Sequence, residues 1–584
     1  MCGIIAISGK NSDALKNEKV LSMLATLSRR GPDDKGFDRF AGSVVGQTRL
    51  SIVDLSTGHQ PMRDNARPHT IVFNGEIYGY KDLRADLESR GHRFGTASDT
   101  EVVLKAYAEY GEDCVKYIDG MFAFAIWDEE KGRLFVARDR FGKKPFYYTT
   151  VDSTFYAASE IKSLFATGLV RGEVDPAALD EYLRLMYVPP DRTVYSNIHT
   201  LPPAHAGLVE GGVLRSWRYW DLEKKPFTGT YAEAKAKVRE LFDAAVAKRM
   251  VADVEVGALL SGGIDSTLVT LYAQRHSKSP IKTFSVGYDG GKSELPYALE
   301  ASKKIGTDHY PLDVSADLSH ELEEIVSYMD EPHGDSSNFP QHLISKLAAT
   351  KVKVALSGDG ADELFMGYGW YQKHAHTPRW KLSRWLGDDF STYLKQITIF
   401  NERERKRLIK TPINPKAPFW KVIMDGIRDP LQKINIFDIK VYLPGQLLAK
   451  IDRTSMMHSL EIRSPFLDTA LAEYVYNLPN EFKISRVEKR MLKEMLGEVF
   501  PTEFVHRRKQ GFAAPVKDWL GQKTIKKLVE KLLRDDSRMY TFIARDEVLS
   551  ILRRFYGGEI ILAQKLWTLF CLALWFREHE KNHA

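Results

Sequence analysis

The second residue of the chain is a cysteine, and this position allows one residue to supply both a nucleophile and a base. Cys2 follows the initiator methionine, which is usually removed before a small residue, so we expect Cys2 to become the N-terminus. Its α-amine, with an ordinary pKa of about 7.7–8.0, could accept the proton of its own thiol, whose ordinary pKa is about 8.5. Position alone favours a simpler alternative, a small apolar residue at the start of a strand.

A glycine-rich segment in the second half could bind pyrophosphate. Ser261-Gly-Gly-Ile-Asp-Ser266 follows a short apolar run and opens an apolar helix. Glycines allow backbone N–H groups to approach phosphate oxygens, and a helix N-terminus is the positive end of a dipole. Ser261 and Ser266 add hydroxyl donors, and Asp265 could hold Mg²⁺. The phosphate loop with a Gly-Lys-Ser/Thr ending is absent, which argues against γ-phosphoryl transfer.

A second loop of the same kind, Ser357-Gly-Asp-Gly-Ala-Asp-Glu363, follows the apolar run Val352–Leu356. Loops at the ends of strands in one parallel sheet face the same crevice, so Asp362 is expected to share Mg²⁺ with Asp265. The alternative for Asp359, Asp362 and Glu363 is helix capping and first-turn charge.

The elements that must position these residues differ between the two halves. Short strands with hairpin connections dominate the first 200 residues, and a helix over 101–110 lies among them, which predicts a layered α+β domain. Examples of the predicted strands are Gly3–Ser8, Ser43–Val53, Thr70–Phe73, Phe122–Trp127, Arg133–Ala137, Pro145–Thr149 and Thr154–Ala158. A polar stretch over 221–230 reads as a linker.

Strands and helices alternate after this linker, which predicts an α/β domain with a parallel sheet. The predicted strands are Val254–Leu260, Lys282–Gly287, His309–Val314 and Val352–Leu356, and the predicted helices are Pro296–Ile305, Leu318–Met329 and Phe339–Ala349. From about Arg379 onward the pattern is mostly helical. The apolar stretch Leu566–Phe576 is too short to span a membrane and reads as a buried helix.

Composition excludes several classes of protein. The chain has 584 residues, of which 43% are hydrophobic and 27% charged, and 83 basic against 77 acidic side chains leave a net charge of +6. This excludes disordered and collagen-like chains and argues against a nucleic-acid wrapper. Three distant cysteines exclude a disulfide framework or a zinc–thiolate cluster and suit a reducing cytoplasm.

Four further motifs follow Cys2 in order: Arg30-Gly-Pro-Asp33, Arg49-Leu-Ser-Ile-Val53, Asn74-Gly-Glu76 and Ser98-Asp-Thr-Glu101. The ordered set resembles the class II glutamine amidotransferase domain. The resemblance implies an N-terminal-nucleophile fold, a four-layer sandwich, over residues 2–210. It also implies that Cys2 attacks the side-chain amide of glutamine.

The same resemblance implies roles for the other motif residues. The Asn74 amide and the Gly75 N–H would stabilise the oxyanion. Arg49 would pair with the substrate α-carboxylate, and Glu76 and Asp99 would hold its α-ammonium. The implied glutamine-binding set is Arg49, Leu50, Ile52, Val53, Asn74, Gly75, Glu76 and Asp99.

The two loops of the second half resemble those of ATP pyrophosphatase synthetases. The segments Lys450–Asp468 and Arg508–Phe512 extend the likeness to the synthetase half of glutamine-dependent asparagine synthetases, and this implies an adenine-nucleotide-binding synthetase domain over 232–584 with ATP and Mg²⁺. Lys509 would neutralise the leaving pyrophosphate, and Asp359 would lie near the attacking amine. The implied ATP-binding set is Leu259, Ser261, Gly262, Gly263, Asp265, Ser266, Val286, Ser357 and Gly358, with Asp265 and Asp362 on the metal.

Together the two halves predict a synthetase that hydrolyses glutamine, adenylates aspartate and forms asparagine. The alternative is the same chemistry on another carboxylate, either a sugar acid or a peptide or antibiotic precursor, although Glu331–Ser337 resembles the aspartate-type enzymes. A β-lactam-forming relative would have no use for Cys2, and a non-catalytic storage protein would not need the intact motifs. The expected partners are small molecules, without nucleic acid or membrane; the expected location is cytoplasmic, and a homodimer remains open.

Three residues depart from the family pattern. Arg29 and Gln47 stand where the family often has histidine, which affects the tuning of the first site rather than its reaction. Met366 stands where glycine is usual, so a close backbone contact is expected to differ there.

Overall fold

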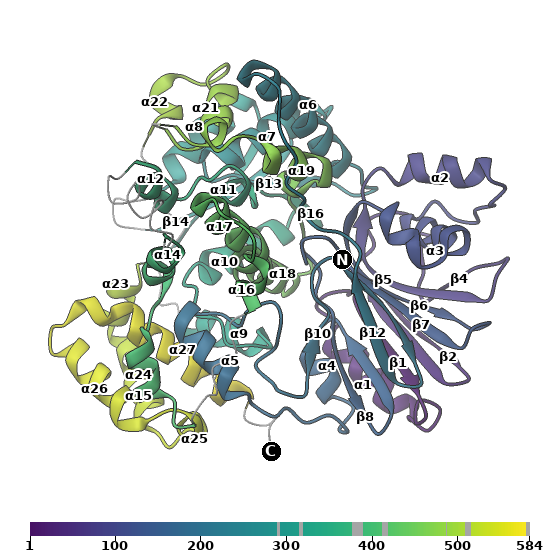
Figure 1. The fold of residues 1–584 in the computed structure, drawn as a ribbon, viewed down its shortest axis with the longest axis horizontal. Helices are drawn as coiled ribbons and strands as arrows, with labels where there is room; N and C mark the ends of the chain where they lie inside the picture. The colour runs from purple at the N-terminus through teal and green to yellow at the C-terminus, as the bar shows by residue number, and fades with distance from the viewer. Residues whose placement is uncertain are drawn as a thin grey trace.

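The computed structural model describes residues 1–288, 293–314, 319–376, 389–411, 419–485, 487–507 and 515–579. The strand-rich first 220 residues, apart from helix α5 (Pro176–Leu185), lie on one side of the molecule, and the remainder, mostly helical around one parallel sheet, lies on the other together with α5 (Figure 1).

The first region contains two six-stranded antiparallel sheets. Their strand orders are β10-β8-β9-β1-β3-β2 and β12-β11-β7-β6-β5-β4. The strands are β1 (Gly3–Gly9), β2 (Asp34–Phe40), β3 (Ser43–Arg49), β4 (Met62–Arg63), β5 (His69–Ile77), β6 (Gly120–Asp128), β7 (Arg133–Arg138), β8 (Tyr147–Val151), β9 (Thr154–Ala158), β10 (His199–Thr200), β11 (His205–Glu210) and β12 (Val213–Arg218).

Both faces of the central strands are buried, so the region has four layers. In β1, Ile4 and Ala6 belong to a hydrophobic cluster with Val72 of the other sheet, whereas Ile5 and Ile7 on the opposite face belong to the larger core. Side chains alternate across a strand, so this division places one layer of core between the sheets and another beneath each helix layer. Helices α1 (Asn17–Thr26) and α4 (Ile161–Phe165) cover one sheet, and α2 (Tyr80–Ser89) and α3 (Asp99–Tyr110) lie on the other side. The predicted four-layer sandwich is confirmed.

The second region is built on a five-stranded parallel sheet, as the sequence predicted. Its order is β15-β14-β13-β16-β17, with β13 (Val256–Leu259), β14 (Lys282–Tyr288), β15 (Asp308–Val314), β16 (Val354–Leu356) and β17 (Glu461–Arg463). Because β13 pairs directly with β16, the loops that follow them emerge side by side. Strand β17 is an edge strand of this sheet, and its side chains contact the first region.

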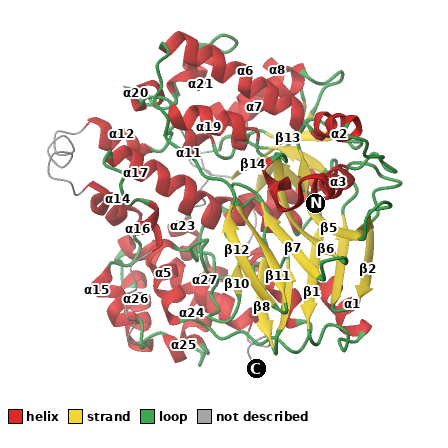
Figure 2. Cartoon of the chain, turned by 45° about the vertical axis from the view of Figure 1, so that its right-hand side comes forward, coloured by secondary structure: helices red, strands yellow, loops and turns green. Residues whose placement is uncertain are grey.

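Helices surround this sheet and continue to the end of the described chain (Figure 2). They include α5 (Pro176–Leu185), α6 (Tyr231–Arg249), α7 (Ile264–Arg275), α8 (Leu295–Ile305), α9 (Ser319–Tyr328), α10 (Asn338–Ala349), α11 (Ala361–Leu364), α12 (Gly369–His376), α14 (Asp389–Ile397), α15 (Glu402–Leu408), α16 (Phe419–Ile423), α17 (Pro430–Phe437), a π-helix over Asp438–Leu448, α18 (Ala449–Met456), α19 (Thr469–Asn477), α20 (Asn480–Lys483), α21 (Arg490–Leu496), α22 (Thr502–Val505), α23 (Val516–Gly521), α24 (Lys523–Arg534), α25 (Met539–Phe542) and α26 (Arg545–Tyr556).

The last helix, α27 (Ala563–His579), is the apolar one. By length and composition alone the segment Ile560–His579 could cross a membrane, with a hydropathy of 1.4, but 67% of its most apolar window is buried inside the protein. Trp567 and Trp575 are almost fully buried against the rest of the chain. It therefore packs as a core helix, as predicted.

One strand prediction needs correction, and six strands were not named from the sequence: β2, β4, β10, β11, β12 and β17. The strand predicted over 43–53 ends at Arg49, because Leu50–Val53 turns away to form a loop. The three-residue β17 was not predicted at all, because it is too short to show an alternating pattern.

Candidate active site

Cys2 lies at the start of β1 with only 7% of its surface exposed. Its backbone N–H donates to Asn74 Oδ1 at 3.0 Å. The other end of that amide, Asn74 Nδ2, is buried and has no hydrogen-bond partner among the described residues. A buried donor without a partner is costly, so this one is well suited to a ligand oxygen beside Cys2.

The thiol of Cys2 needs a base to become a nucleophile. Burial raises its pKa, although the N-terminal amine, the Leu50 N–H and Arg49 each lower it. The thiol is therefore mainly protonated near neutral pH, and a proton acceptor must lie close by.

A small pocket beside Cys2 brings together most of the predicted glutamine-binding residues. Its volume, with Met1 in place, is about 30 Å³. The lining residues are Met1, Cys2, Arg49, Leu50, Ile52, Val53, Gly58, Gln60, Phe73, Gly75, Glu76, Ser98, Asp99, Thr100 and Glu461. Met1 is only 2% exposed, so its removal would enlarge the pocket.

Ionic groups of both signs converge on this pocket. Arg49 donates through Nη2 to the carbonyl oxygens of Val53 (3.2 Å) and Asp54 (2.6 Å), which holds the guanidinium in place. Asp99 Oδ2 accepts from the Ile77 N–H at 2.9 Å, and burial raises the pKa of Asp99 to about 6. Burial likewise raises the pKa of Glu76, against the opposing effect of Arg463.

Sequence reasoning missed two residues that reach this pocket from the second region. Glu461 and Arg463 are both on β17, and Arg463 Nη2 lies 3.0 Å from Glu76 Oε2. Arg463 Nε donates to Glu461 Oε1 at 2.7 Å, and Glu461 Oε2 lies 3.2 Å from the Met1 ammonium. Only the spacing of Glu461 and Arg463, two residues apart on one face of a strand, could have indicated them.

The first predicted phosphate loop is ordered by its own hydroxyls. Ser261 Oγ lies 3.0 Å from Ser266 Oγ and accepts from the Gly263 N–H at 3.2 Å. Gly262 has φ +72°, and a Cβ there would come within 2.6 Å of the Tyr297 backbone, so only glycine fits. The loop ends at the N-terminus of the twelve-residue helix α7, where anions bind favourably.

The second loop packs directly against the first. A Cβ on Gly358 would lie 2.8 Å from the Asp265 Cβ, so a side chain there would force the loops apart. Ser357 N–H donates to the Arg463 carbonyl at 2.9 Å, which ties the loop to β17. Burial raises the pKa of Asp359 in this loop. Leu259 and Val286 lie in the neighbouring strands β13 and β14 with 7–8% exposure.

The two predicted metal ligands, Asp265 and Asp362, both pair with one lysine that the sequence did not indicate. Lys489 Nζ lies 2.5 Å from Asp265 Oδ2 and 2.7 Å from Asp362 Oδ1. Although burial lowers the pKa of Lys489, the two carboxylates raise it overall. Two carboxylates that share one ammonium are close enough to share one Mg²⁺, which takes few protein ligands together with phosphate oxygens.

Lys509, with the rest of the segment 508–512, lies outside the described residues. The neighbouring Arg507 donates to the Gly262 carbonyl at 2.8 Å, so the chain reaches the first phosphate loop at that point. Lys450 Nζ binds Ser337 Oγ at 2.7 Å and Asp335 Oδ2 at 3.3 Å, which places the Glu331–Ser337 segment beside α18.

The three departures from the family pattern each have a structural setting. Arg29 pairs with Glu324 at 3.2 Å across the two regions. Gln47 Nε2 donates to the Phe73 carbonyl at 2.8 Å. Met366 has φ +53°, a backbone conformation that favours glycine, so the side chain is accommodated there at a cost.

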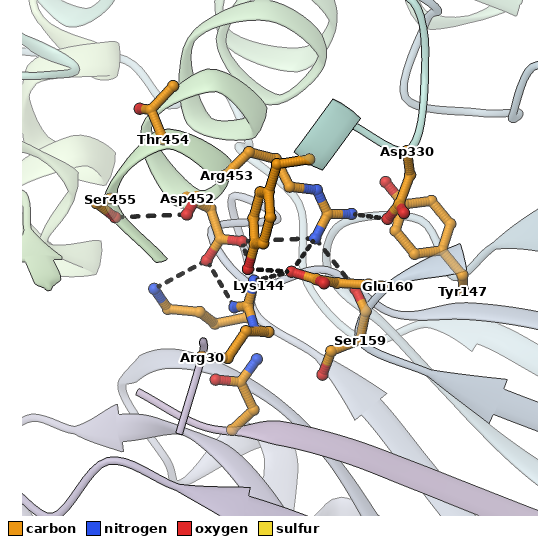
Figure 3. A network of polar contacts seen from close by, with 12 residues as sticks. Arg30, Lys144, Tyr147, Ser159, Glu160, Asp330, Asp452, Arg453, Thr454 and Ser455 are labelled. Carbon is orange, nitrogen blue, oxygen red and sulfur yellow. Dashed lines mark hydrogen bonds and ion pairs between the residues drawn. The ribbon is translucent and has the colours of Figure 1, made fainter. Parts of the chain in front are cut away.

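A buried ionic network lies between the two sites (Figure 3). Arg30 donates through Nε to the Cys2 carbonyl at 3.0 Å and pairs through Nη1 with Asp452 (2.7 Å) and Glu160 (3.1 Å). Arg453, next to Asp452 on α18, lies 2.9 Å from Asp330 and 3.2 Å from Glu160. Because removing one partner of a buried ion pair is costly, this network fixes the relative position of the two regions.

Comparisons with known proteins match both regions of the chain. A family model described as asparagine synthase matches residues 237–577, and a glutamine amidotransferase domain model matches residues 1–220. Glutamine-hydrolyzing asparagine synthetase 3 of Bacillus subtilis is 33% identical, over 94% of this chain and 93% of the relative. Glutamine-hydrolyzing asparagine synthetase 1 of the same organism is 32% identical, over 98% of this chain and 96% of the relative.

Proposed function

The chain belongs to the asparagine synthetase family, and from that premise we propose that it makes asparagine from aspartate with glutamine as nitrogen donor and ATP as energy source. The family uses ATP, and its members act on small molecules. The proposal assigns glutamine hydrolysis to the pocket at Cys2 and amide synthesis to the crevice beside β13 and β16.

In the first step, the Cys2 α-amine, exposed by loss of Met1, takes the thiol proton, and the sulfur attacks the glutamine side-chain amide. Asn74 Nδ2 and the Gly75 N–H receive the oxyanion; the orphaned amide donor beside Cys2 is the observation that carries this assignment. Arg49 binds the α-carboxylate, and Glu76 and Asp99 bind the α-ammonium. Ammonia leaves, and water hydrolyses the thioester to give glutamate.

In the second step, the loops at Ser261–Ser266 and Ser357–Glu363 bind the nucleotide, with Leu259 and Val286 beside it. The aspartate side-chain carboxylate attacks the α-phosphate, pyrophosphate leaves, and ammonia then displaces AMP from the adenylate. Asp359 lies near the attacking amine, and Lys509 neutralises the pyrophosphate. The closely packed loops support this assignment, since the ends of neighbouring parallel strands are where such sheets bind ligands.

Asp265 and Asp362 would hold Mg²⁺, which supplies positive charge to the polyphosphate as it leaves. The pair of carboxylates on one ammonium supports this, because their separation suits a single cation. Lys489 must then turn from at least one carboxylate, and its ammonium would remain within reach of the phosphates.

A panel of acids tests the proposal and its alternative together. The purified chain is given ATP, Mg²⁺ and glutamine with aspartate, a sugar acid or a peptide carboxylate, and the products are separated. AMP, pyrophosphate, glutamate and asparagine in equal amounts, formed only with aspartate, are expected. An amide formed on another acid would establish the alternative substrate, and ADP with phosphate would contradict the assignment of the nucleotide loops.

A further inference from the structure

Strand β17 is shared by the two sites, although it belongs to the sheet of the second region. On one side, its Arg463 carbonyl accepts the Ser357 N–H at the start of the second phosphate loop. On the other side, its Glu461 side chain lines the pocket of Cys2, and its Arg463 side chain pairs with Glu76 of that pocket. The glutamine pocket is therefore completed by the synthetase region.

Glu461 is the residue of β17 that faces the start of the chain. Its side chain is about 1% exposed, and Oε1 is engaged by Arg463 Nε at 2.7 Å. The second oxygen, Oε2, lies 3.2 Å from the Met1 ammonium and accepts no other hydrogen bond among the described residues. Loss of Met1 would make Cys2 the N-terminal residue, and this carboxylate oxygen would then be directed at the Cys2 α-amine.

We propose that Glu461 is a positioning residue for glutamine hydrolysis: its carboxylate holds and stabilises the Cys2 α-ammonium that forms when the α-amine takes the thiol proton. The proposal rests on the proposed function of Cys2. Thiol, amine and carboxylate then act in series, as nucleophile, base and orienting anion do in other hydrolases, with the anion supplied by the other region.

The proton balance of the step is complete within these groups. The Cys2 S–H bond breaks, and its proton passes to the α-amine as the S–C bond to the amide carbon forms. When the C–N bond breaks, the α-ammonium returns the proton to the departing nitrogen, and ammonia leaves. The same amine then takes a proton from the water that hydrolyses the thioester and returns it to the sulfur. Glu461 remains ionised throughout.

The charges around the amine are consistent with an ionised Glu461. Although burial would raise the pKa of Glu461, the N-terminal ammonium and Arg463 lower it overall. Arg463 is also held by the carbonyl oxygens of Arg249 (2.9 Å) and Val251 (2.7 Å), so it does not depend on Glu461 for its position. Among the described residues, the charged groups that face this end of the chain are Arg30 after α1, Arg49 on β3, Glu76 on β5, Asp99 on α3, Lys144 after β7, and Glu461 and Arg463 on β17.

The test is the full-length Glu461→Gln variant, which keeps the acceptor for Arg463 and removes the charge. Glutamine and glutaramate, an analogue without the α-amino group, are hydrolysed over a range of pH. The proposal predicts a fall in kcat of about 10- to 100-fold on both substrates with little change in KM, in line with the size of a base-orienting effect. The acid limb of kcat/KM should move to lower pH, because loss of the carboxylate lowers the pKa of the amine.

Two variants serve as controls. Glu473→Gln removes another carboxylate between the regions, the acceptor of Trp220 Nε1, and should leave hydrolysis unchanged. Glu461→Asp keeps the charge and should keep the wild-type acid limb. Synthesis from ammonium chloride should persist in all three variants, which shows that they are folded.

Other outcomes overturn the proposal. An increase in KM for glutamine but not for glutaramate would assign Glu461 to the substrate ammonium, and an unchanged kcat and acid limb would give it no role. Failure of the wild-type chain to hydrolyse glutamine would instead refute the function proposed for Cys2. If Glu461→Gln does not fold, Glu461→Asp becomes the test. A shift in the acid limb of kcat/KM for Glu461→Asp would then contradict the proposal.

Discussion

The two candidate sites differ in what their polar groups do before any substrate arrives. In the glutamine pocket the expected donors are ready: Asn74 Nδ2 is oriented by Cys2 and has no partner of its own among the described residues. In the nucleotide crevice the expected metal ligands are already paired with Lys489. The first site is thus preorganised for charge that develops in a transition state, whereas the second must exchange one cation for another. The following variants test this contrast.

Replacing the nucleophile should have the largest effect. Cys2→Ala is expected to lower glutamine-dependent synthesis by more than roughly 1,000-fold, because no other group in the pocket can form the thioester. Synthesis from ammonium chloride should remain near the wild-type rate, because the crevice is untouched. Both rates can be measured by asparagine release, and loss of both would show that the sites are not separable.

Removing the preorganised donor should have the next largest effect. Asn74→Ala is expected to lower kcat for glutamine hydrolysis by about 100- to 1,000-fold, the usual result of losing one oxyanion donor. Glutamate release under saturating glutamine measures this. A change confined to KM would mean that Asn74 binds the ground state only, and the contrast between the sites would weaken.

If Mg²⁺ replaces the Lys489 ammonium in the crevice, the effect of losing Lys489 on the free energy of unfolding should depend on Mg²⁺. Lys489→Met should lower the free energy of unfolding by about 2 kcal/mol without Mg²⁺, because two partly buried carboxylates lose the ammonium that both of them contact. Mg²⁺ should restore more stability to this variant than to wild type. Chemical denaturation with and without Mg²⁺ measures both effects.

Lys493→Met is the matched control for that prediction. Lys493 lies on α21, the helix that follows Lys489. Its Nζ pairs with Glu488 Oε1 at 2.9 Å, and this ion pair does not include either expected metal ligand. Its replacement should leave the response to Mg²⁺ at the wild-type level. An equal response in the two variants would show that Lys489 does not stand in for the metal.

The smallest predicted effect is on pH dependence in the glutamine pocket. Burial raises the pKa of Asp99 to about 6, so this carboxylate becomes protonated as the pH falls through that value. It then no longer attracts the substrate α-ammonium, and KM for glutamine should rise about tenfold or less between pH 7 and pH 5. This prediction is checked by measuring KM for glutamine between pH 7 and pH 5 in wild type and in Asp99→Asn. The variant should have a raised KM at pH 7 that changes little as the pH falls.

Local signals predicted much of the fold and of both sites. Ser261 and Ser266 contact each other across five positions of the chain, and the strand before them shows in a short apolar run. Three of the four motifs after Cys2 contribute residues to the pocket beside it, and Arg30 of the remaining motif donates to the Cys2 carbonyl. The functional roles of these residues stay predictions.

The residues that sequence reasoning missed act over long separations. Lys489 lies 224 positions from Asp265, and Glu461 contacts the first residue of the chain from another sheet. Lys489 meets Asp265 through packing within the second region, whereas Glu461 meets Met1 through packing of the two regions against each other. The edge position of β17, which brings Glu461 to the pocket, follows from the order of the sheet rather than from the three residues themselves.

The most direct measurement follows the nitrogen. The chain is supplied with glutamine labelled with ¹⁵N in its side-chain amide, together with ATP, Mg²⁺ and aspartate, and the products are analysed by mass spectrometry. The account predicts asparagine that carries the label, formed with one AMP for each amide, and no labelled asparagine from Cys2→Ala. Labelled ammonia released without labelled asparagine, or labelled asparagine made by Cys2→Ala, would contradict it.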